Sequence, residues 1–308
     1  MQKLLGSILC LLACHAGCER PPIGPGGVIG VFGKVGIAPG AFSYPRAITV
    51  ARNGDVFVVD KSARVQRFSP DGTFETSWKM PEKVAGKPVG LTVHPDGRVF
   101  VADTHYHRVI VFDPDGNELT RFGEYGTGDG QFLLPTDVAI DADGFIYVSE
   151  YNGNDRITKW EEIGTEARRH GGAKGEVRFV GTLIEGEVGG RPLRRPAALD
   201  IDDEQTLWVA DACNHRILRF TLDGRLLNEF GQMGKDAGQM RYPYDIDVDQ
   251  DGNVMVCEYG NSRLQWFDAQ GHSLRTWGRL GRRLGELNSP WGAARSLDGT
   301  VYVVDSLN

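Results

Sequence analysis

The sequence predicts an all-β protein with the architecture of a six-bladed β-propeller, and three observations point to this fold class. Glycine accounts for 41 of the 308 residues, well above the average usage of about 7%, which indicates many tight turns between short strands. Short strand patterns separated by turn residues recur along the chain. A proline opens a short apolar segment six times, at intervals of 43 to 61 residues: Pro45, Pro88, Pro135, Pro196, Pro243 and Pro290. Four antiparallel strands in a unit of this length form a propeller blade.

The third unit shows the strand pattern most clearly. Residues Asp137–Asp141 alternate with the period of two that is typical of a strand, and Asp143-Gly144 supplies a hairpin turn. Two more strands are expected at Phe145–Glu150 and Arg156–Trp160. In several other units a fourth strand ends in an aromatic residue followed by glycine.

The two ends of the array predict how the ring closes. Val28–Gly33 has the aromatic-glycine ending of a fourth strand, and Val301–Asp305 is the second strand of the sixth unit. We therefore expect Val28–Gly33 to be the outermost strand of the last blade and the third strand of that blade to be missing. The propeller would span residues 28–308 and be truncated at its C-terminus. Val28–Gly33 would then either shift inward to pair with Val301–Val304 or keep an unpaired edge.

The first residues predict export and a lipid anchor. Lys3 precedes an apolar run, Leu4–Leu12, that is too short to span a bilayer. Residues 1–17 are expected to be a signal peptide of the lipoprotein type, and residues 18–27 a linker. Cys18 is the expected lipidated residue, with Cys14 as the alternative; plain secretion stays open. The protein would then be an exported, membrane-anchored lipoprotein of the periplasm or cell surface, held at the membrane through its lipid alone.

Composition narrows the expected partners. The formal net charge of −7 disfavours unspecific binding to nucleic acid. We expect a monomer that binds an unknown protein or small-molecule ligand. Only Cys213 and Cys257 lie in the folded part, which excludes a disulfide framework. Two free thiols are expected, and one Cys213–Cys257 bridge is the alternative.

Each second strand ends in a carboxylate, and in five units an arginine follows four to six residues later. The simplest expectation is that each carboxylate pairs with its arginine and fixes the loop between the second and third strands. A metal-binding ring of acidic residues is the alternative. The carboxylates are Asp60, Asp103, Glu150, Asp211, Glu258 and Asp305, and the arginines are Arg64, Arg108, Arg156, Arg216 and Arg263.

Three of these segments resemble the NHL-repeat family. They run from Asp103 to Arg108, from Asp211 to Arg216 and from Glu258 to Arg263, each after an apolar strand. The resemblance covers roughly residues 28–308 and implies a six-bladed propeller of the NHL type. The overall pattern is similar to that of uncharacterised bacterial NHL-repeat lipoproteins. One fold hosts many functions, so the resemblance implies little about chemistry.

Departures from the repeat predict a ligand site at the top face, where first strands begin and second strands end. Two residues after the proline, only the third and fifth units carry aspartate, and the same two units end their second strand in Glu-Tyr. Aromatic walls with a few converging polar groups are typical of small-molecule sites; packing of core and loops is the alternative. The ligand-binding candidates are Arg46, Asp137, Glu150, Tyr151, Tyr244, Asp245, Glu258, Tyr259 and Trp291.

Known propeller enzymes supply the alternative function, a metal-dependent lyase or lactonase at the channel mouth. The peptidyl-hydroxyglycine amidating lyases hold zinc through three histidines, and the resemblance matches only His107. His105 and His215 are expected on the same face, so these three histidines are the weak metal candidates. The channel carboxylates could serve a calcium-dependent lactonase of the gluconolactonase type, although no local motif of that family is present. The sequence therefore favours a binding module without assigned catalytic residues or cofactor, with a divalent cation at the channel mouth as the alternative.

Overall fold

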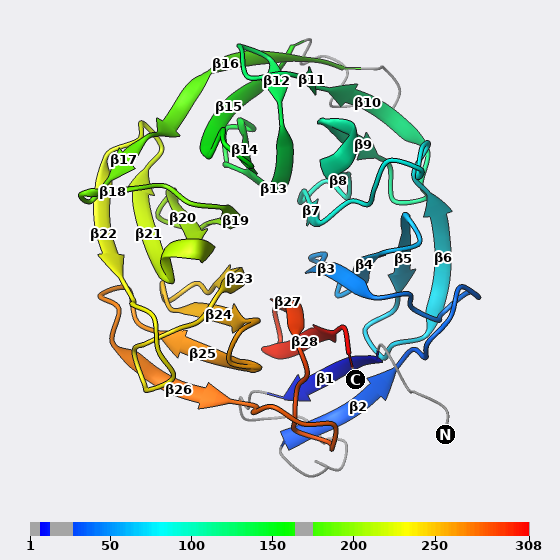
Figure 1. The fold of residues 1–308 in the computed structure, drawn as a ribbon. Coiled ribbons are helices and arrows are strands. Elements are labelled where there is room, and N and C mark those ends of the chain that lie inside the picture. Colours follow the sequence, from blue (N-terminus) through cyan, green and yellow to red (C-terminus); the bar gives the residue numbers. More distant parts are fainter. Residues whose placement is uncertain (1–6, 13–26, 164–174, 308) are drawn as a thin grey trace.

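The computed structural model describes residues 7–12, 27–163 and 175–307, and for residues 7–12 it describes the backbone alone. Antiparallel four-stranded sheets surround a central axis, with the first strand of each sheet nearest the axis (Figure 1). The only named helical segments in these ranges are single turns, Thr104–Tyr106 and Ala212–Asn214. The predicted all-β propeller is confirmed, but the sequence predicts six blades and the structure has five blades of consecutive strands beside one composite sheet.

Five blades each consist of four strands that are consecutive in the chain. The first blade contains β3 (Pro45–Val50), β4 (Val56–Asp60), β5 (Arg64–Phe68) and β6 (Phe74–Lys79). The second contains β7 (Gly90–Val93), β8 (Val99–Asp103), β9 (Arg108–Phe112) and β10 (Glu118–Phe122). The third contains β13 (Leu134–Ile140), β14 (Ile146–Tyr151), β15 (Arg156–Ile163) and β16 (Glu176–Glu185). The fourth contains β19 (Pro196–Ile201), β20 (Thr206–Asp211), β21 (Arg216–Thr221) and β22 (Leu226–Phe230). The fifth contains β23 (Pro243–Val248), β24 (Val254–Glu258), β25 (Arg263–Phe267) and β26 (Ser273–Trp277).

Short strand pairs lie in two of the loops between blades. They are β11 (Glu124–Tyr125) with β12 (Gln131–Phe132), and β17 (Glu187–Val188) with β18 (Arg191–Pro192). Both pairs precede a first strand, so they lie in the loops that lead to the top face.

A composite sheet joins the two ends of the described chain. Its strand order is β2 (Val28–Phe32), β1 (Ser7–Leu12), β28 (Thr300–Asp305) and β27 (Pro290–Arg295). Strand β2 is outermost. The prediction that this sheet lacks its third strand is wrong. Strand β1 lies in the third position and pairs antiparallel with β28 on one side and β2 on the other (Figure 1).

The backbone explains why a strand occupies this position. Without β1, both β28 and β2 would present a row of unpaired N–H and C=O groups. The sequence-based expectation fails because it assigns Ser7–Leu12 to a signal peptide and leaves that segment out of the propeller. Neither expected arrangement of Val28–Gly33 forms, since β2 pairs with β1 and not with β28. Removal of residues 1–17 would open the position between β28 and β2.

The hydrophobic core lies between neighbouring sheets. Second strands are covered on both faces, which is why they read as apolar runs; β4 is buried at all five positions. Phe57 and Val59 of this strand share one buried cluster with Val99 and Val101 of the next blade. Full burial of each such side chain contributes about 1.5–3 kcal/mol to the free energy of unfolding. This packing fixes the blades side by side and so places the loops at the channel mouth.

No helix among the described residues has the length and apolar character needed to cross a bilayer.

Candidate functional site

Ion pairs between second-strand carboxylates and arginines organise the mouth loops, as the sequence predicts. Asp211 accepts a 2.8 Å hydrogen bond from Arg216 Nε, and both side chains are fully buried. The same pairing occurs in the other four blades: Asp60 with Arg64, Asp103 with Arg108, Glu150 with Arg156, and Glu258 with Arg263.

The same carboxylates also bind the loop before the first strand. In four blades and the composite sheet, the amide two residues before the blade-opening proline donates to the carboxylate at the end of the second strand. The donors are Ser43, Leu133, Arg194, Arg241 and Asn288. In the second blade, Asp103 Oδ1 is buried without a partner. In the first, third, fourth and fifth blades the carboxylate thus holds two loops at once, which gives the mouth a rigid rim.

Glu150 and Glu258 belong to this rim and not to the channel. Both are 0% exposed, and each accepts a 2.6 Å hydrogen bond from the Nε of its arginine. Burial raises the pKa of both carboxyls above the ordinary value. These two residues are therefore poorly placed to contact a ligand, although the sequence includes them among the candidates.

The aromatic candidates do come together at the mouth. The rings of Tyr244 and Tyr259 stack at 4.8 Å, and the ring of Trp291 lies 4.9 Å from Tyr244 and 5.5 Å from Tyr259. The guanidinium of Arg46 lies over the Trp291 ring at 3.7 Å. Three neighbouring inner strands, β23, β27 and β3, and the end of β24 thus form one aromatic wall. All four side chains are partly exposed.

Arg195 completes this cluster, although it is not among the ligand-binding candidates expected from the sequence. Its guanidinium lies 5.0 Å from the ring of Tyr151 and 4.7 Å from that of Tyr244. It precedes Pro196 and has a φ of +58°, a left-handed conformation that is strained for arginine. The available signal was its position directly before a blade-opening proline, Pro196, whereas Arg46 directly follows Pro45. We call Arg46, Tyr151, Arg195, Tyr244, Tyr259 and Trp291 the mouth cluster.

Aspartates line the channel below the mouth cluster and connect the inner strands of neighbouring blades. An innermost strand has a free edge, so its N–H groups need acceptors. The preceding blade supplies them as carboxylates. Asp137 accepts from the Leu199 amide at 2.9 Å, Asp200 from Val248 at 2.6 Å, Asp245 from Ala293 at 2.9 Å and Asp247 from Arg295 at 2.8 Å. Asp137 and Asp245 therefore line the channel below the mouth, where the sequence places them as ligand candidates, and both are held by backbone amides of a neighbouring blade.

Burial is the main cause that raises the pKa of these carboxyls. The pKa of Asp137 is about 7 and that of Asp200 about 8, the latter also raised by the neighbouring Asp247. The pKa of Asp245 lies well above its ordinary value, with burial as the main cause and Asp137 as the second. Much of this acidic lining is therefore protonated near neutral pH.

Glycines opposite the aspartates explain the departures from the repeat. A Cβ on Gly90 would lie 2.0 Å from the Thr136 carbonyl oxygen and 2.9 Å from Asp137 Oδ1. A Cβ on Gly292 would lie 2.9 Å from Asp245 Oδ2. Gly90 and Gly292 thus leave room for the aspartates of the neighbouring third and fifth blades, whereas the fourth blade, between those two, carries Ala198 at this position.

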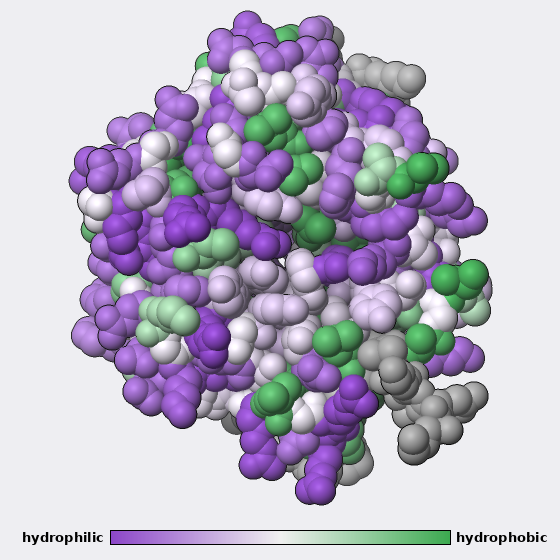
Figure 2. Space-filling model, in the orientation of Figure 1, coloured by the Kyte–Doolittle hydropathy of each residue, from purple (hydrophilic) through white to green (hydrophobic). Residues whose placement is uncertain are grey.

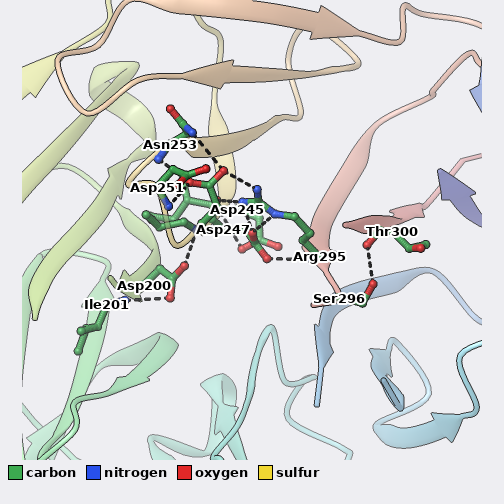
Figure 3. A network of polar contacts seen from close by, with 12 residues as sticks. Asp200, Ile201, Asp245, Asp247, Asp251, Asn253, Arg295, Ser296 and Thr300 are labelled. Atoms are coloured by element: carbon green, nitrogen blue, oxygen red, sulfur yellow. Dashed lines mark hydrogen bonds and ion pairs between the residues drawn. The ribbon is translucent and has the colours of Figure 1, made fainter. Parts of the chain in front are cut away.

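A positively charged side chain, Arg295, lies at the far end of the channel. Arg295 donates from Nη2 to Asp247 at 2.7 Å and from Nη1 to Asp249 at 2.8 Å (Figure 3). A cavity of about 270 Å³ runs from Arg46, Tyr244 and Trp291 past the aspartates to Arg295. The space-filling view shows a mostly hydrophilic face around a narrow central opening (Figure 2).

The family model for the SMP-30/gluconolactonase/LRE-like region matches residues 44–279. The chain belongs to this family. Its match spans nearly all of the five blades, even though no local motif of gluconolactonases is recognisable in the sequence.

Two curated relatives extend the comparison of this SMP-30/gluconolactonase/LRE-like chain. It is 27% identical over 146 residues to "Protein brain tumor" of Drosophila melanogaster, which supports the NHL-type repeat. It is 30% identical over 149 residues to peptidylglycine alpha-amidating monooxygenase of Rattus norvegicus. These matches cover 47% and 44% of the chain but only 12% and 14% of the two relatives.

Solved structures show the fold of the SMP-30/gluconolactonase/LRE-like chain at low sequence identity. A streptogramin B lyase has a TM-score of 0.59 at 17% identity, covering 88% of this chain and 95% of the other. A gluconolactonase of Xanthomonas campestris has a TM-score of 0.58 at 14% identity, covering 86% of each chain. At these identities the likeness supports the propeller fold and does not transfer an activity.

The histidines that the sequence singled out contact loop backbone. In this SMP-30/gluconolactonase/LRE-like chain, His105 Nδ1 accepts from the Lys87 amide, His107 Nδ1 contacts the Leu133 carbonyl, and His215 Nδ1 accepts from the Tyr242 amide. His107 and His215 each end a single helical turn and pack edge-on against a tyrosine at 4.7 Å. Within the described ranges, no group of three or more His, Cys, Asp or Glu side chains is arranged to hold a metal ion.

Cys213 and Cys257 are free thiols, so the alternative of a bridge between them is not realised.

Proposed function

We propose that this propeller binds a small molecule at the top mouth of its channel. The observation that carries the proposal is the mouth cluster, in which three aromatic rings from adjacent strands lie in mutual contact above a 270 Å³ cavity. Small-molecule sites combine such aromatic walls with a few oriented polar groups. Rim loops fixed by buried ion pairs hold the cluster in place before a ligand arrives, which lowers the entropic cost of binding.

A ligand screen by thermal unfolding tests this proposal. A compound at a hundred times its Kd stabilises the folded state by about 2.7 kcal/mol, enough to shift the unfolding temperature measurably. Substitution of Trp291→Leu, or separately Tyr244→Leu, should reduce that shift. Tyr125→Leu is the matched control, because Tyr125 is 70% exposed and its ring contacts His107 outside the mouth cluster. A shift that survives both mouth substitutions would contradict the proposal.

Catalysis in the channel is the second candidate function. Family membership and the pKa of about 7 for Asp137 favour it, since a carboxyl that titrates near neutral pH can exchange protons with a bound substrate. Lactone hydrolysis or a lyase reaction with an added divalent cation would fit the alternative expectation. Purified protein should then turn over a sugar lactone, and Asp137→Asn should lower kcat while the mouth still binds ligand. Equal turnover in both proteins would exclude Asp137 as a catalytic residue.

We also propose that the chain is exported as a lipoprotein, in which case cleavage before Cys18 would remove β1 and open the position between β28 and β2. Support comes from the apolar run after Lys3 and from Cys18 with its preceding Ala16-Gly17; Cys14 and Cys18 lie outside the described residues. Labelled fatty acid should attach to the exported protein, and Cys18→Ser should abolish labelling. Label lost only in Cys14→Ser would move the assignment to Cys14, and unlabelled protein would mean plain secretion.

A further inference from the structure

Two arginine side chains at the mouth carry positive charge without a counter-ion. Among the residues that the structure describes, neither Arg46 nor Arg195 forms an ion pair. Arg195 Nε is buried and has no hydrogen-bond acceptor. The two guanidiniums also repel one another, and this repulsion, after burial, lowers the pKa of Arg46. Unpaired donors and like charges in a part-buried cluster are costly, so their presence calls for a partner that is absent from the protein itself.

The aromatic contacts fix how these guanidiniums can be used. Arg46 lies over Trp291 at 3.7 Å, and Arg195 lies 5.0 Å from the Tyr151 ring and 4.7 Å from the Tyr244 ring. A guanidinium that contacts rings through its flat face keeps its edge N–H groups available. Those edge groups bind a planar carboxylate in the bidentate geometry that arginine favours. Tyr244 joins the two halves of the cluster, because its ring contacts both Arg195 and Trp291.

The surroundings restrict the ligand further. The channel below is lined by Asp137, Asp200, Asp245 and Asp247, which offer no positive charge to an anion, so a carboxylate is favoured at the mouth, where the two guanidiniums lie. A cavity of 270 Å³ lies below the usual range of about 300–1,000 Å³ for drug-sized ligands, which points to a small compound. The aromatic wall adds apolar contact surface beside the guanidiniums, with Tyr244 and Tyr259 stacked and the Trp291 ring edge-on to Tyr259.

We infer that the mouth cluster recognises a small carboxylate that carries a flat apolar group, with Arg46 and Arg195 binding the carboxylate and the aromatic wall binding the flat group. This inference rests on the proposed ligand site and adds the charge class of the ligand. Arg46 and Arg195 act as specificity-determining residues, because they distinguish an anion from its neutral analogue of equal shape.

Phenylacetate and its neutral isostere phenylacetamide are suitable probes. Their Kd values can be measured by titration of the intrinsic tryptophan fluorescence and confirmed by ligand-observed NMR. Phenylacetate should bind at least about tenfold more tightly than phenylacetamide, since charge-assisted hydrogen bonds are the stronger ones. Arg46→Gln and Arg195→Gln should each weaken phenylacetate binding on the order of tenfold and leave phenylacetamide binding unchanged.

Matched variants separate charge from geometry and folding. Arg191→Gln removes a positive charge from an exposed side chain on β18, outside the cluster, and should leave both Kd values unchanged. Arg46→Lys keeps the charge but loses the flat face over Trp291 and should also weaken phenylacetate. Unfolding curves of all variants show whether the fold is kept.

The outcomes distinguish this inference from the proposed function. Equal binding of both probes, unaffected by either arginine substitution, would overturn the carboxylate assignment and leave the small-molecule site standing. No binding of either probe at millimolar concentrations would count against both.

Discussion

Replacement of Asp200 by asparagine tests whether the channel carboxyls are protonated in the folded protein. The Asp200 side chain accepts hydrogen bonds from the Ile201 amide at 2.8 Å and the Val248 amide at 2.6 Å. Burial and the neighbouring Asp247 raise its pKa to about 8. In the unfolded chain an aspartate titrates near pH 3.9.

The sign of the pH effect follows from these two pKa values. Between about pH 4 and pH 8, the folded protein keeps a proton at Asp200 that the unfolded chain has lost. The stabilisation is therefore complete below the unfolded pKa and is lost as the pH rises through the folded pKa. One such proton lowers the free energy of unfolding by about 1.4 kcal/mol per pH unit, or on the order of 3 kcal/mol between pH 5 and pH 7.

Asparagine removes this pH-dependent contribution and adds a constant cost. Its side chain offers one oxygen acceptor, so one of the two amide hydrogen bonds is lost, which costs about 1–3 kcal/mol at every pH. Asp200→Asn should thus be less stable than the natural protein at pH 5, and the two stability curves should converge or cross near neutral pH. Asp137, with its pKa of about 7, leaves a residual slope of the same sign in the variant.

Guanidinium unfolding at pH 5, 6, 7 and 8, at constant ionic strength, measures these curves. Asp203→Asn is the control, because Asp203 is exposed on the adjacent turn and should leave the slope unchanged. Parallel stability curves for Asp200→Asn and the natural protein would refute the reasoning, since they would show that Asp200 is ionised in both states.

Three further predictions concern packing and reactivity. Gly90→Ala should lower the free energy of unfolding by about 1–3 kcal/mol through overpacking, because its Cβ would meet the Thr136 carbonyl oxygen at 2.0 Å. Gly181→Ala is the control: a Cβ there has no atom within 4 Å, so the change should stay below about 1 kcal/mol. Similar losses for the two variants in urea unfolding would contradict this prediction. Arg216→Met should lower the free energy of unfolding by about 3–5 kcal/mol, because it leaves Asp211 buried without its arginine. Arg178→Met removes an ion pair whose arginine is 65% exposed and should cost less than about 1 kcal/mol. Chemical unfolding that gives equal losses for the two variants would disprove the buried pairing. Cys213 should react with a thiol reagent in the native protein, and Cys257 only after unfolding. Cys257 is 1% exposed, and burial raises the pKa of its thiol, so little reactive thiolate is accessible. Labelling of Cys257 in the native protein, detected by peptide mass spectrometry, would argue against this packing.

The repeat made the blade pattern and the rim ion pairs predictable from sequence. Each unit shows the same strand periods, and the carboxylate and arginine recur at fixed positions, so their pairing in Asp211 and Arg216 follows from the pattern. The aromatic wall was predictable for the same reason. Tyr244 and Trp291 each follow a blade-opening proline, and prolines mark the top face in every unit.

The assignment of Glu150 and Glu258 to the site was an error of periodicity. Successive side chains of a strand point to opposite faces. In each Glu-Tyr pair, only one residue can face the mouth, and the structure turns Tyr151 and Tyr259 inward while the glutamates pair with arginines.

Contacts between blades could not be predicted from one repeat unit. The bonds from Asp200 to Val248 and from Asp247 to Arg295 join residues 48 positions apart, and they depend on how neighbouring inner strands are staggered. The same holds for the fit of Gly90 beside Asp137. The place of β1 in the composite sheet was missed because its apolar sequence equally fits a signal peptide.

The charged side chains are distributed unevenly along the channel, and this distribution determines where an anion can bind. Guanidiniums stand at the mouth, carboxyls with raised pKa values line the middle, and Arg295 is neutralised by Asp247 and Asp249 at the far end. Because Asp137 titrates near neutral pH, it is partly protonated there and adds less negative charge to the lining than an ordinary aspartate would. The free positive charge of the channel therefore lies at one end only. An anionic ligand that enters from the top meets Arg46 and Arg195 first, and it gains nothing electrostatically by moving deeper, since the protein amides and Arg295 already satisfy the carboxylates there. The mouth, and not the middle of the channel, is thus where the fold concentrates its capacity to bind an anion.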